Sequence, residues 1–384
     1  YEVRAEKLKE EAKLIFAQVV ADDDLVAKLE LVDSVRKLGL ASFFEDEIKE
    51  GLDHVVSFAI GKPSSHMKHS LHFCALSFRL LRQHGYHVSQ DIFSEFVDKP
   101  TRSFMESKCC GDTLGLVELF EASHLGLEHE DIMEEANRFS ARILKSSYPS
   151  LLLHHDKDLA ECVAHALELP IHWRVQWFDV KWHIKVHEKR KKVDRALIDL
   201  AKVNFNVVQS ALQKDLRQIA SNGSVSSSGT VIAVHSFFSV LNSNTTRGMK
   251  GLSEKNHHHL IHNVCLIIRL CNDIGTSKVE QERGEVASSS IACYMREANT
   301  TEEKAKDHIK GLITKVWKKI NEQCFGRQPP MITPGLFVDI TTNMARVAHN
   351  LYQHGDGFGG QDHKHHHKKQ ILSLLVHPLK LESS

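Results

Sequence analysis

The stretch 267–286 contains four polar side chains whose types and spacing could do chemistry. Asn272, Thr276 and Glu280 follow one another at intervals of four residues, and Arg269 precedes them by three. On a helix, four residues turn about 400°, so these side chains drift by only about 40° per step and share one stripe. An amide oxygen, a hydroxyl and a carboxylate are hard ligands that suit Mg²⁺ or Mn²⁺. The guanidinium could bind the phosphates of an anionic substrate that completes the coordination.

The same spacing has a second interpretation, in which the stripe is the polar face of an ordinary solvated helix. One full charge among three ligands is too little to hold Mg²⁺ tightly without an anionic substrate. The spacing alone therefore leaves both a metal and phosphate site and a solvated face open.

Two histidine clusters, His257–His259 and His363–His367, could bind a transition metal. No carboxylate or cysteine at a suitable spacing completes either set, so a solvated helix start and a loop are favoured. The eight cysteines contain no Cys-x-x-Cys pair. This argues against a zinc site or a disulfide scaffold and favours a reducing compartment.

The elements that must position the stripe are predicted to be helices. Apolar residues recur three or four positions apart, as in Leu8, Ala12, Ile15 and Val19, and alternating strand patterns are absent. The predicted fold class is therefore all-α. The predicted helices are 5–20, 25–38, 70–85, 88–97, 113–121, 129–145, 158–168, 173–190, 193–219, 231–241, 252–282, 288–298, 301–323 and 335–353.

Composition breaks divide this helical pattern. A division is expected near 185–195, and the Ser- and Gly-rich stretch 221–230 is a candidate linker. The acidic run 22–24 is predicted to be a loop that caps the next helix. The segment 354–368 is predicted to be a loop rich in Gly and His, and the apolar tail 371–376 is expected to dock back on the fold.

The numbers of charged residues argue against some classes of binding partner. Lys plus Arg equals Asp plus Glu at 49 each, so the chain has no general attraction for nucleic acid or an anionic membrane. No apolar run is long enough to span a bilayer. The chain opens at Tyr1 without Met, which is typical of a processed or partial product, so a targeting segment is not visible.

The sequence NDIGTSKVE at 272–280 resembles the second metal motif of class I terpene synthases, Asn/Asp-Asp-Leu/Ile/Val-x-Ser/Thr-x-x-x-Glu, at every defined position. Further stretches resemble plant terpene synthases, and the opening YEVRAEKLKEEAK is similar to the monoterpene-forming branch. Nearly the whole chain is covered. The stretches are 72–96, 119–136, 165–190, 200–216, 231–242 and 350–359.

The resemblance implies a Mg²⁺-dependent carbon–oxygen lyase. Such enzymes bind a prenyl diphosphate through three Mg²⁺ ions, release diphosphate and fold the allylic cation in an apolar, aromatic-lined pocket. By resemblance, Asn272, Thr276 and Glu280 match metal ligands and Arg269 matches a diphosphate-binding residue. Geranyl diphosphate is the implied substrate and a monoterpene the product. The implied compartment is the plastid, with the cytoplasm as the alternative.

The resemblance also implies a domain arrangement. Residues 1–190 are similar to the amino-terminal α-barrel domain, and residues 191–384 are similar to a class I terpenoid synthase α-domain. Asp356 and Phe358 lie in the segment that resembles the lid loop before the last helix. This lid is expected to be mobile without ligand.

One family motif has no counterpart in this chain. Class I enzymes carry an aspartate-rich motif, Asp-Asp-x-x-Asp, on a helix that faces the second motif. The run 22–24 has no third Asp in register, and Glu130, Asp131 and Glu134 reproduce only its outline. Both fall in the part that resembles the amino-terminal domain, so solvated acidic faces are favoured.

The chain departs from the family pattern near 219–224. In the family a long block separates the counterparts of LQKDL and VSSSGTVIAVH, whereas here the two ends meet across a few residues. The class I domain is therefore predicted to be incomplete. Leu260, Val264, Ile267 and Ile268 are expected to be exposed, with a monomer or weak self-association as the outcome.

The missing block gives a second functional hypothesis. The chain would be a non-catalytic helical protein, which is a truncated product, the result of a mis-joined gene model, or a partner of an intact synthase.

Overall fold

The computed structural model describes residues 2–21, 24–59, 70–153, 157–189, 194–222, 255–282, 289–326, 335–353 and 372–381, together with 355 and 369. These residues are almost entirely helical, and the only extended pairing among them is an isolated bridge between Val97 and Phe104. The prediction of an all-α fold is confirmed.

The helices in chain order are α1 (Glu2–Ala21), α2 (Leu25–Lys37), η1 (Ala41–Phe43), α3 (Glu45–Ala59), α4 (Leu71–Gln83), η3 (Gln90–Phe96), α5 (Glu106–Cys109), α6 (Thr113–Ser123), α7 (Asp131–Leu153), α8 (Lys157–Glu168), η4 (Ile171–Trp173), α9 (Gln176–Glu188), α10 (Arg195–Asn222), α13 (Lys255–Glu282), α14 (Ser290–Ala298), α15 (Glu302–Phe325) and α16 (Gly335–Tyr352). Among the described residues, no helix is both long and apolar enough to cross a membrane.

Local signals account for several helix boundaries. The Asp24 carboxylate accepts hydrogen bonds from the backbone N–H groups of Val26 (2.9 Å) and Ala27 (3.1 Å), so the predicted cap of α2 is confirmed at this residue. Asp22 and Asp23 lie outside the described residues. The segment predicted as a helix over 88–97 is instead a 3₁₀ helix over Gln90–Phe96, in which Phe93 and Phe96 are both buried.

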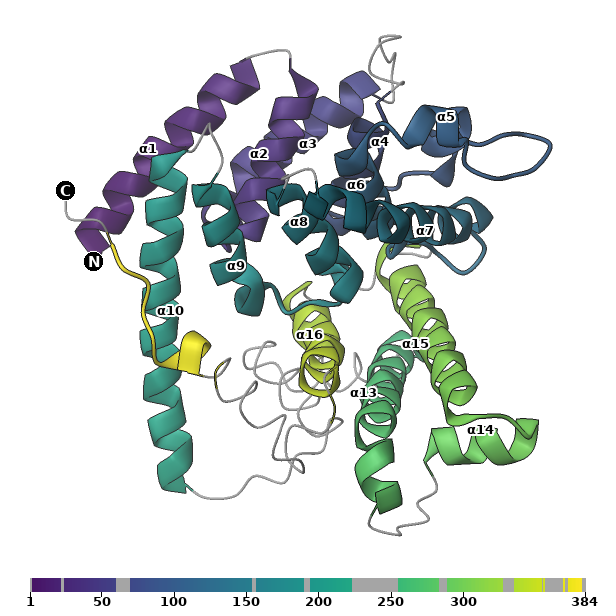
Figure 1. The fold of residues 1–384 in the computed structure, drawn as a ribbon. Coiled ribbons are helices and arrows are strands. Elements are labelled where there is room, and N and C mark those ends of the chain that lie inside the picture. The colour runs from purple at the N-terminus through teal and green to yellow at the C-terminus, as the bar shows by residue number, and fades with distance from the viewer. Residues whose placement is uncertain are drawn as a thin grey trace.

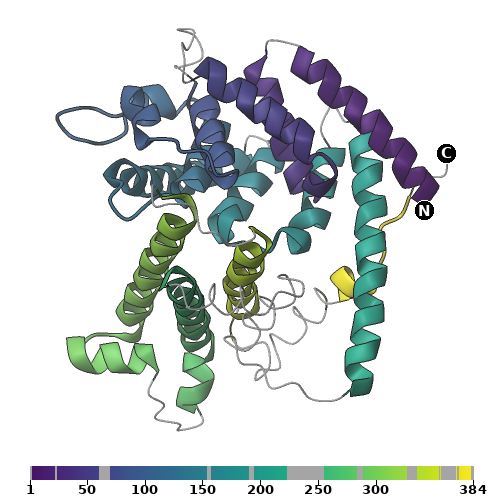
Figure 2. The ribbon, with the colours of Figure 1, turned by 180° about the vertical axis from the view of Figure 1, so that it is seen from behind.

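The buried apolar side chains form two clusters. One joins α1 to α10 and includes Leu374 from the tail, and the other joins α13, α14, α15 and α16. Figure 1 and the reverse view in Figure 2 show α13, α14 and α15 grouped apart from the amino-terminal helices, with α16 between the two groups. We call these groups the amino-terminal unit (α1 to α10) and the carboxy-terminal unit (α13 to α16).

The expectation that one face of α13 would be exposed is wrong. Leu260, Val264 and Ile267 are at most 1% exposed, and Ile268 is half-buried. They pack in one cluster with residues of α15 and α16, which include Trp317. Helices of this chain therefore cover the stripe that was expected to lose its partners.

Buried polar contacts join the two units. His172 Nε2 lies 2.8 Å from Asn321 Oδ1, and Asn321 Nδ2 donates to the carbonyl oxygen of His124 over 2.9 Å. Arg346 Nε donates to the carbonyl oxygen of His172 over 2.8 Å. The 3₁₀ turn that holds His172 is thus bound by both α15 and α16.

The carboxy-terminal tail packs against α9 and α10, as predicted. Gln209 Nε2 donates to the carbonyl oxygen of Leu374 over 2.6 Å, and Asn206 Nδ2 donates to that of Leu379 over 2.9 Å. Leu374 is 6% exposed and belongs to the core of the amino-terminal unit.

Candidate functional site

The predicted polar stripe lies on α13. Thr276 Oγ1 is 2.8 Å from Glu280 Oε1 and 3.0 Å from the backbone oxygen of Asn272. A hydroxyl has one proton to donate, and the shorter contact to a charged acceptor is the stronger choice. Thr276 is 9% exposed, whereas Asn272 and Glu280 are half-buried. Local helix geometry therefore brings the hydroxyl and the carboxylate together, as their spacing predicts.

The chemistry of these donors fits a hard divalent cation. In octahedral Mg²⁺ sites with bonds of about 2.0–2.1 Å, neighbouring ligand oxygens are about 2.8–3.0 Å apart. The 2.8 Å between Thr276 Oγ1 and Glu280 Oε1 falls in that range. These two oxygens could hold one Mg²⁺ or Mn²⁺, with Asn272 one turn away on the same stripe.

Arg269 has a partner that the sequence reasoning did not assign. Its Nε lies 2.8 Å from Oδ1 of Asp273, whose other oxygen accepts the backbone N–H of Ser290 over 2.8 Å. Asp273 is 2% exposed, whereas the side chain of Arg269 is 61% exposed. The carboxylate therefore orients Arg269 along α13 and fixes the start of α14. A charge four residues after Arg269, inside the motif, was the signal that could have shown it.

The opposite face of α13 is held close to α16 and α15. A Cβ atom added to Gly275 would lie 3.0–3.3 Å from atoms of Tyr352, including its backbone oxygen. Trp317 Nε1 donates to His349 Nε2 over 2.9 Å, and His349 Nδ1 lies 3.7 Å from Cys271 Sγ. Burial lowers the pKa of His349 to about 4, so its ring is neutral and its Nδ1–H faces the sulfur.

The substituted acids at 130–134 do not form a shared site. Each of the three side chains contacts a different cation, and only the first is buried. The pairs are Glu130 with Arg82 (2.7 Å), Asp131 with Arg102 (3.7 Å) and Glu134 with Lys318 (3.3 Å). The predicted solvated acidic face is confirmed at Asp131 and Glu134, which are exposed, and is wrong at Glu130, which is buried beside Arg82. The run offers no facing half for α13.

One cluster of metal-type donors is present among the described residues, on α8 and α9. Asp179 Oδ2 lies 3.0 Å from His165 Nε2 and 3.2 Å from His183 Nε2. Arg174 Nη1 lies 3.5 Å from the other carboxylate oxygen. Burial favours the neutral acid, but hydrogen bonds from both imidazoles and the Arg174 charge hold the pKa of Asp179 well below its usual range. The carboxylate is already neutralised by protein groups, so the cluster is an ion-pair network.

Several candidate residues lie outside the described ranges. These are Asp356 and Phe358 of the expected lid and the histidines at 363–367. The predicted helix 231–241 and the expected junction after residue 222 also lie outside them.

Comparisons with known families give matches along most of the chain. Residues 1–167 match "Terpene synthase, N-terminal domain", and residues 185–319 match "Terpene synthase family, metal binding domain". The second match contains the stripe on α13.

Individual relatives are similar over the full length. An alpha-farnesene synthase of Ricinus communis is 38% identical and covers 100% of this chain and 91% of its own. A chloroplastic isoprene synthase of Pueraria montana var. lobata is 28% identical over 98% of this chain and 84% of its own. The alignment with the first relative runs over 532 residues, whereas this chain has 384, so at least 148 aligned positions (532 minus 384) face no residue here.

A solved structure shows the same fold. The isoprene synthase of grey poplar leaves, in complex with three Mg²⁺ ions and dimethylallyl-S-thiolodiphosphate, has a TM-score of 0.78 and 26% identity. The match covers 99% of this chain and 97% of that one.

Proposed function

Because the chain belongs to the terpene synthase family, we propose that α13 binds Mg²⁺ together with the diphosphate group of a prenyl substrate. The family reaction is the ionisation of that substrate to a terpene with release of diphosphate, which makes the enzyme a carbon–oxygen lyase. The proposal is carried by one observation, the 2.8 Å approach of Thr276 Oγ1 and Glu280 Oε1 within the metal motif.

Each residue of the stripe has a defined part in this proposal. Asn272, Thr276 and Glu280 supply three oxygen ligands, of which only the Glu280 carboxylate carries a full negative charge. Asp273 holds the Arg269 guanidinium at the surface of α13, where its exposed end can meet a phosphate oxygen. Mg²⁺, when bound, supplies positive charge to the leaving diphosphate.

We further propose that this chain turns over slowly. The aspartate-rich half of the family site is expected to be absent across 219–224, and a gap of that kind agrees with the aligned positions that face no residue here. Among the described residues, the only group of three His, Cys, Asp or Glu side chains close enough to share a metal ion lies on α8 and α9. Loss of most counter-charge at the leaving group costs several kcal/mol of barrier, on the order of 10³-fold in rate or more.

Two substrates are candidates. Geranyl diphosphate is the substrate expected from the opening sequence, which is similar to the monoterpene branch. Farnesyl diphosphate is the second candidate, because the relative at 38% identity makes alpha-farnesene, whereas the isoprene synthase is 28% identical. The higher identity favours the longer prenyl chain.

The compartment is proposed from the resemblance, and the assembly state is a separate proposal. The plastid is proposed because a relative is named chloroplastic, with the cytoplasm as the alternative. A monomer or weak self-association is proposed for the chain itself.

A binding assay tests the metal site. Isothermal titration of diphosphate in the presence of Mg²⁺ is expected to give weak, Mg²⁺-dependent binding that falls at least about tenfold in Glu280→Ala. Glu297→Ala, which removes an exposed carboxylate at the end of α14, is the matched control and should bind as the parent does. Equal binding by both variants would show that the stripe is an ordinary polar face.

A product assay tests turnover. The purified chain is incubated with Mg²⁺ and either geranyl or farnesyl diphosphate, and volatile products are analysed by gas chromatography with mass spectrometry. We expect negligible terpene from both. Robust terpene formation from either would overturn the proposal of slow turnover. Binding without turnover would support the alternative of a non-catalytic protein that retains the ancestral metal motif.

A further inference from the structure

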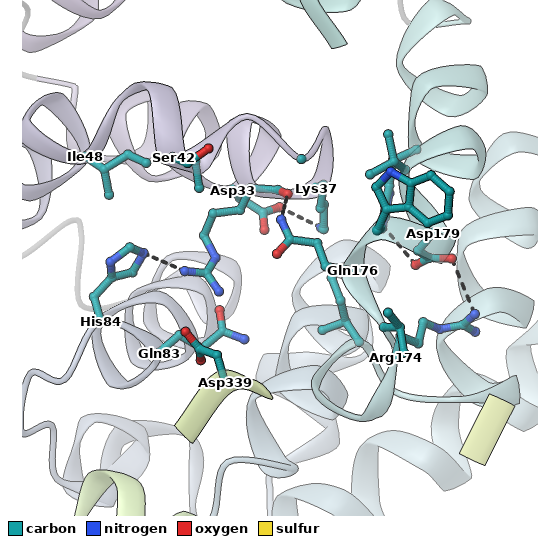
Figure 3. A pocket seen from close by; sticks show the side chains of 18 of the residues that line it. Asp33, Lys37, Ser42, Ile48, Gln83, His84, Arg174, Gln176, Asp179 and Asp339 are labelled. Carbon is teal, nitrogen blue, oxygen red and sulfur yellow. Dashed lines mark hydrogen bonds and ion pairs between the residues drawn. The ribbon is translucent and has the colours of Figure 1, made fainter. Parts of the chain in front are cut away.

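A cavity of about 970 Å³ lies between the amino-terminal unit and α16. Its walls come mainly from α2, α3, α9 and α16, and none of its lining residues belongs to α13. Figure 3 shows His84, Gln83 and Asp339 at one end, with Arg174 and Asp179 at the other. The volume is at the upper end of the range of about 300–1,000 Å³ for small-molecule sites.

Most of the cations in these walls are neutralised by carboxylates of the fold. Arg79 Nη2 lies 2.8 Å from Asp33 and 2.7 Å from Glu118, and Lys37 Nζ lies 2.6 Å from Asp33. These groups form a closed network and have no need of a ligand.

Arg36 differs, because its partner is neutral. Its Nη1 lies 2.8 Å from His84 Nε2, and among the described residues it forms no ion pair with a carboxylate. Burial, followed by the charge of Arg36, lowers the pKa of His84 to about 4, so the ring accepts this hydrogen bond as a neutral base. Burial and the nearby Arg79 lower the pKa of Arg36 itself to about 10. The guanidinium is therefore a half-buried cation with too little negative charge around it.

Arg346 on α16 also has neutral partners in place of a carboxylate among the described residues. It donates to three neutral acceptors: Nε to the carbonyl oxygen of His172 (2.8 Å), and Nη1 to Asn343 Oδ1 (2.8 Å) and Thr342 Oγ1 (3.0 Å). Burial lowers its pKa. Asp339 is the lining carboxylate whose charge favours both arginines, yet in the described part of the chain it forms no direct ion pair with either.

We propose that this cavity binds a phosphate or diphosphate group, held without a metal ion by Arg36 from α2 and Arg346 from α16. A planar guanidinium matches phosphate oxygens, and two of them suit an anion that carries at least two charges. His84 orients one fork and the backbone of His172 orients the other, so the site is preorganised. The bound anion would supply the negative charge that both arginines lack and would connect the two units.

Titration of inorganic diphosphate into the full chain, with EDTA present to remove divalent cations, tests this site. We expect saturable binding that weakens by at least about tenfold in Arg36→Gln. Asp339→Asn removes the competing carboxylate and should tighten binding several-fold. Arg138→Gln, at an exposed position of α7, is the matched control and should leave binding unchanged.

The two cavity variants have opposite expected signs, so a general loss of folding cannot imitate the result. Circular dichroism checks that each variant is folded. If Arg36→Gln does not fold, unchanged binding by Asp339→Asn overturns the proposal. Absence of saturable binding at millimolar diphosphate also overturns it, as does loss of metal-free binding in Arg269→Gln, which would assign the anion to α13. The metal-dependent binding proposed for α13 is measured separately and can fail or succeed independently.

Discussion

Helix α4 and helix α13 each carry an arginine beside carboxylates, and the two are used in different ways. Arg79 on α4 is 1% exposed and lies between Asp33 and Glu118 from two other helices. Arg269 on α13 is 61% exposed and contacts Asp273 on its own helix. Around Arg79, buried charges cancel one another and connect helices. On α13, a charge is held in place but remains accessible to a ligand.

The largest expected effect comes from breaking the buried network. Arg79→Met leaves Asp33 and Glu118 with Lys37 in place of two shared cations, and loss of one partner of a buried pair costs about 3–5 kcal/mol. The free energy of unfolding, measured by urea denaturation, should fall by that amount. The matching substitution on α13, Arg269→Met, should change the free energy of unfolding by less than about 0.5 kcal/mol, since an exposed ion pair on one helix contributes little. Similar losses of stability from both substitutions would contradict the difference proposed between the buried ion pairs of Arg79 and the exposed ion pair of Arg269.

Acid should loosen the junction between the units. Burial lowers the pKa of His172 to about 3 and those of His124 and His349 to about 4, against about 6.5 in the unfolded chain. The unfolded chain then binds more protons below about pH 6.5, so this stability is present above that pH and is lost as the pH falls. Burial also raises the pKa of Glu121 to about 7. The effect of Glu121 on the free energy of unfolding has the opposite sign, because the stability that it gives at low pH is lost as the pH rises.

The net change expected from these four groups is a loss of about 1–2 kcal/mol in the free energy of unfolding between about pH 7 and pH 6. Urea denaturation at a series of pH values measures it. His349→Gln keeps an acceptor for Trp317 and removes one titrating group, so its pH dependence should be shallower than that of the parent chain. A parent stability that is flat or rises as the pH falls across this range would show that the buried histidines are already protonated or are exposed.

The smallest effect compares two glycines inside helices of the carboxy-terminal unit. Gly275→Ala places a methyl group 3.0–3.3 Å from Tyr352, including a backbone oxygen, and should destabilise the chain by about 1 kcal/mol. Gly311→Ala, on α15, meets nothing within 4 Å and should stabilise it by about 0.5–1 kcal/mol through helix propensity. Thermal unfolding of the two variants should therefore shift in opposite directions. Stabilisation by both substitutions would mean that α13 and α16 can move apart at no cost.

The spacing of residues along the sequence predicted those features of the fold and the site that depend on residues close together in the sequence. Helical spacing identified most helices and placed Thr276 beside Glu280, because four residues span about one turn. Helix α3 was not predicted, although Ile48, Leu52 and Val55 have the same spacing and are buried. The spacing of these three residues therefore also indicates a helix.

Contacts between distant segments could not be predicted in the same way. Ser290 reaches Asp273 across 17 residues, and the burial of Ile267 depends on where α15 and α16 pack. The arginines of the cavity stand on α2 and α16, and their shared surroundings appear only when the two units meet. Spacing gives neighbours on one helix, whereas packing between helices decides which charges remain uncompensated.

The docking of the tail on α10 has a consequence for biosynthesis. Helix α1 packs against α10 through contacts such as Arg4 with Asp199, and Leu374 and Leu379 reach the same helix near the end of the chain. During translation, α10 can cover α1 long before the tail leaves the ribosome exit tunnel. The contacts that Asn206 and Gln209 make with the carbonyl oxygens of Leu379 and Leu374 then form only after those residues have been synthesised. A nascent chain stalled before residue 372 should therefore be more sensitive to protease along α10 than the released protein, with α1 already in place.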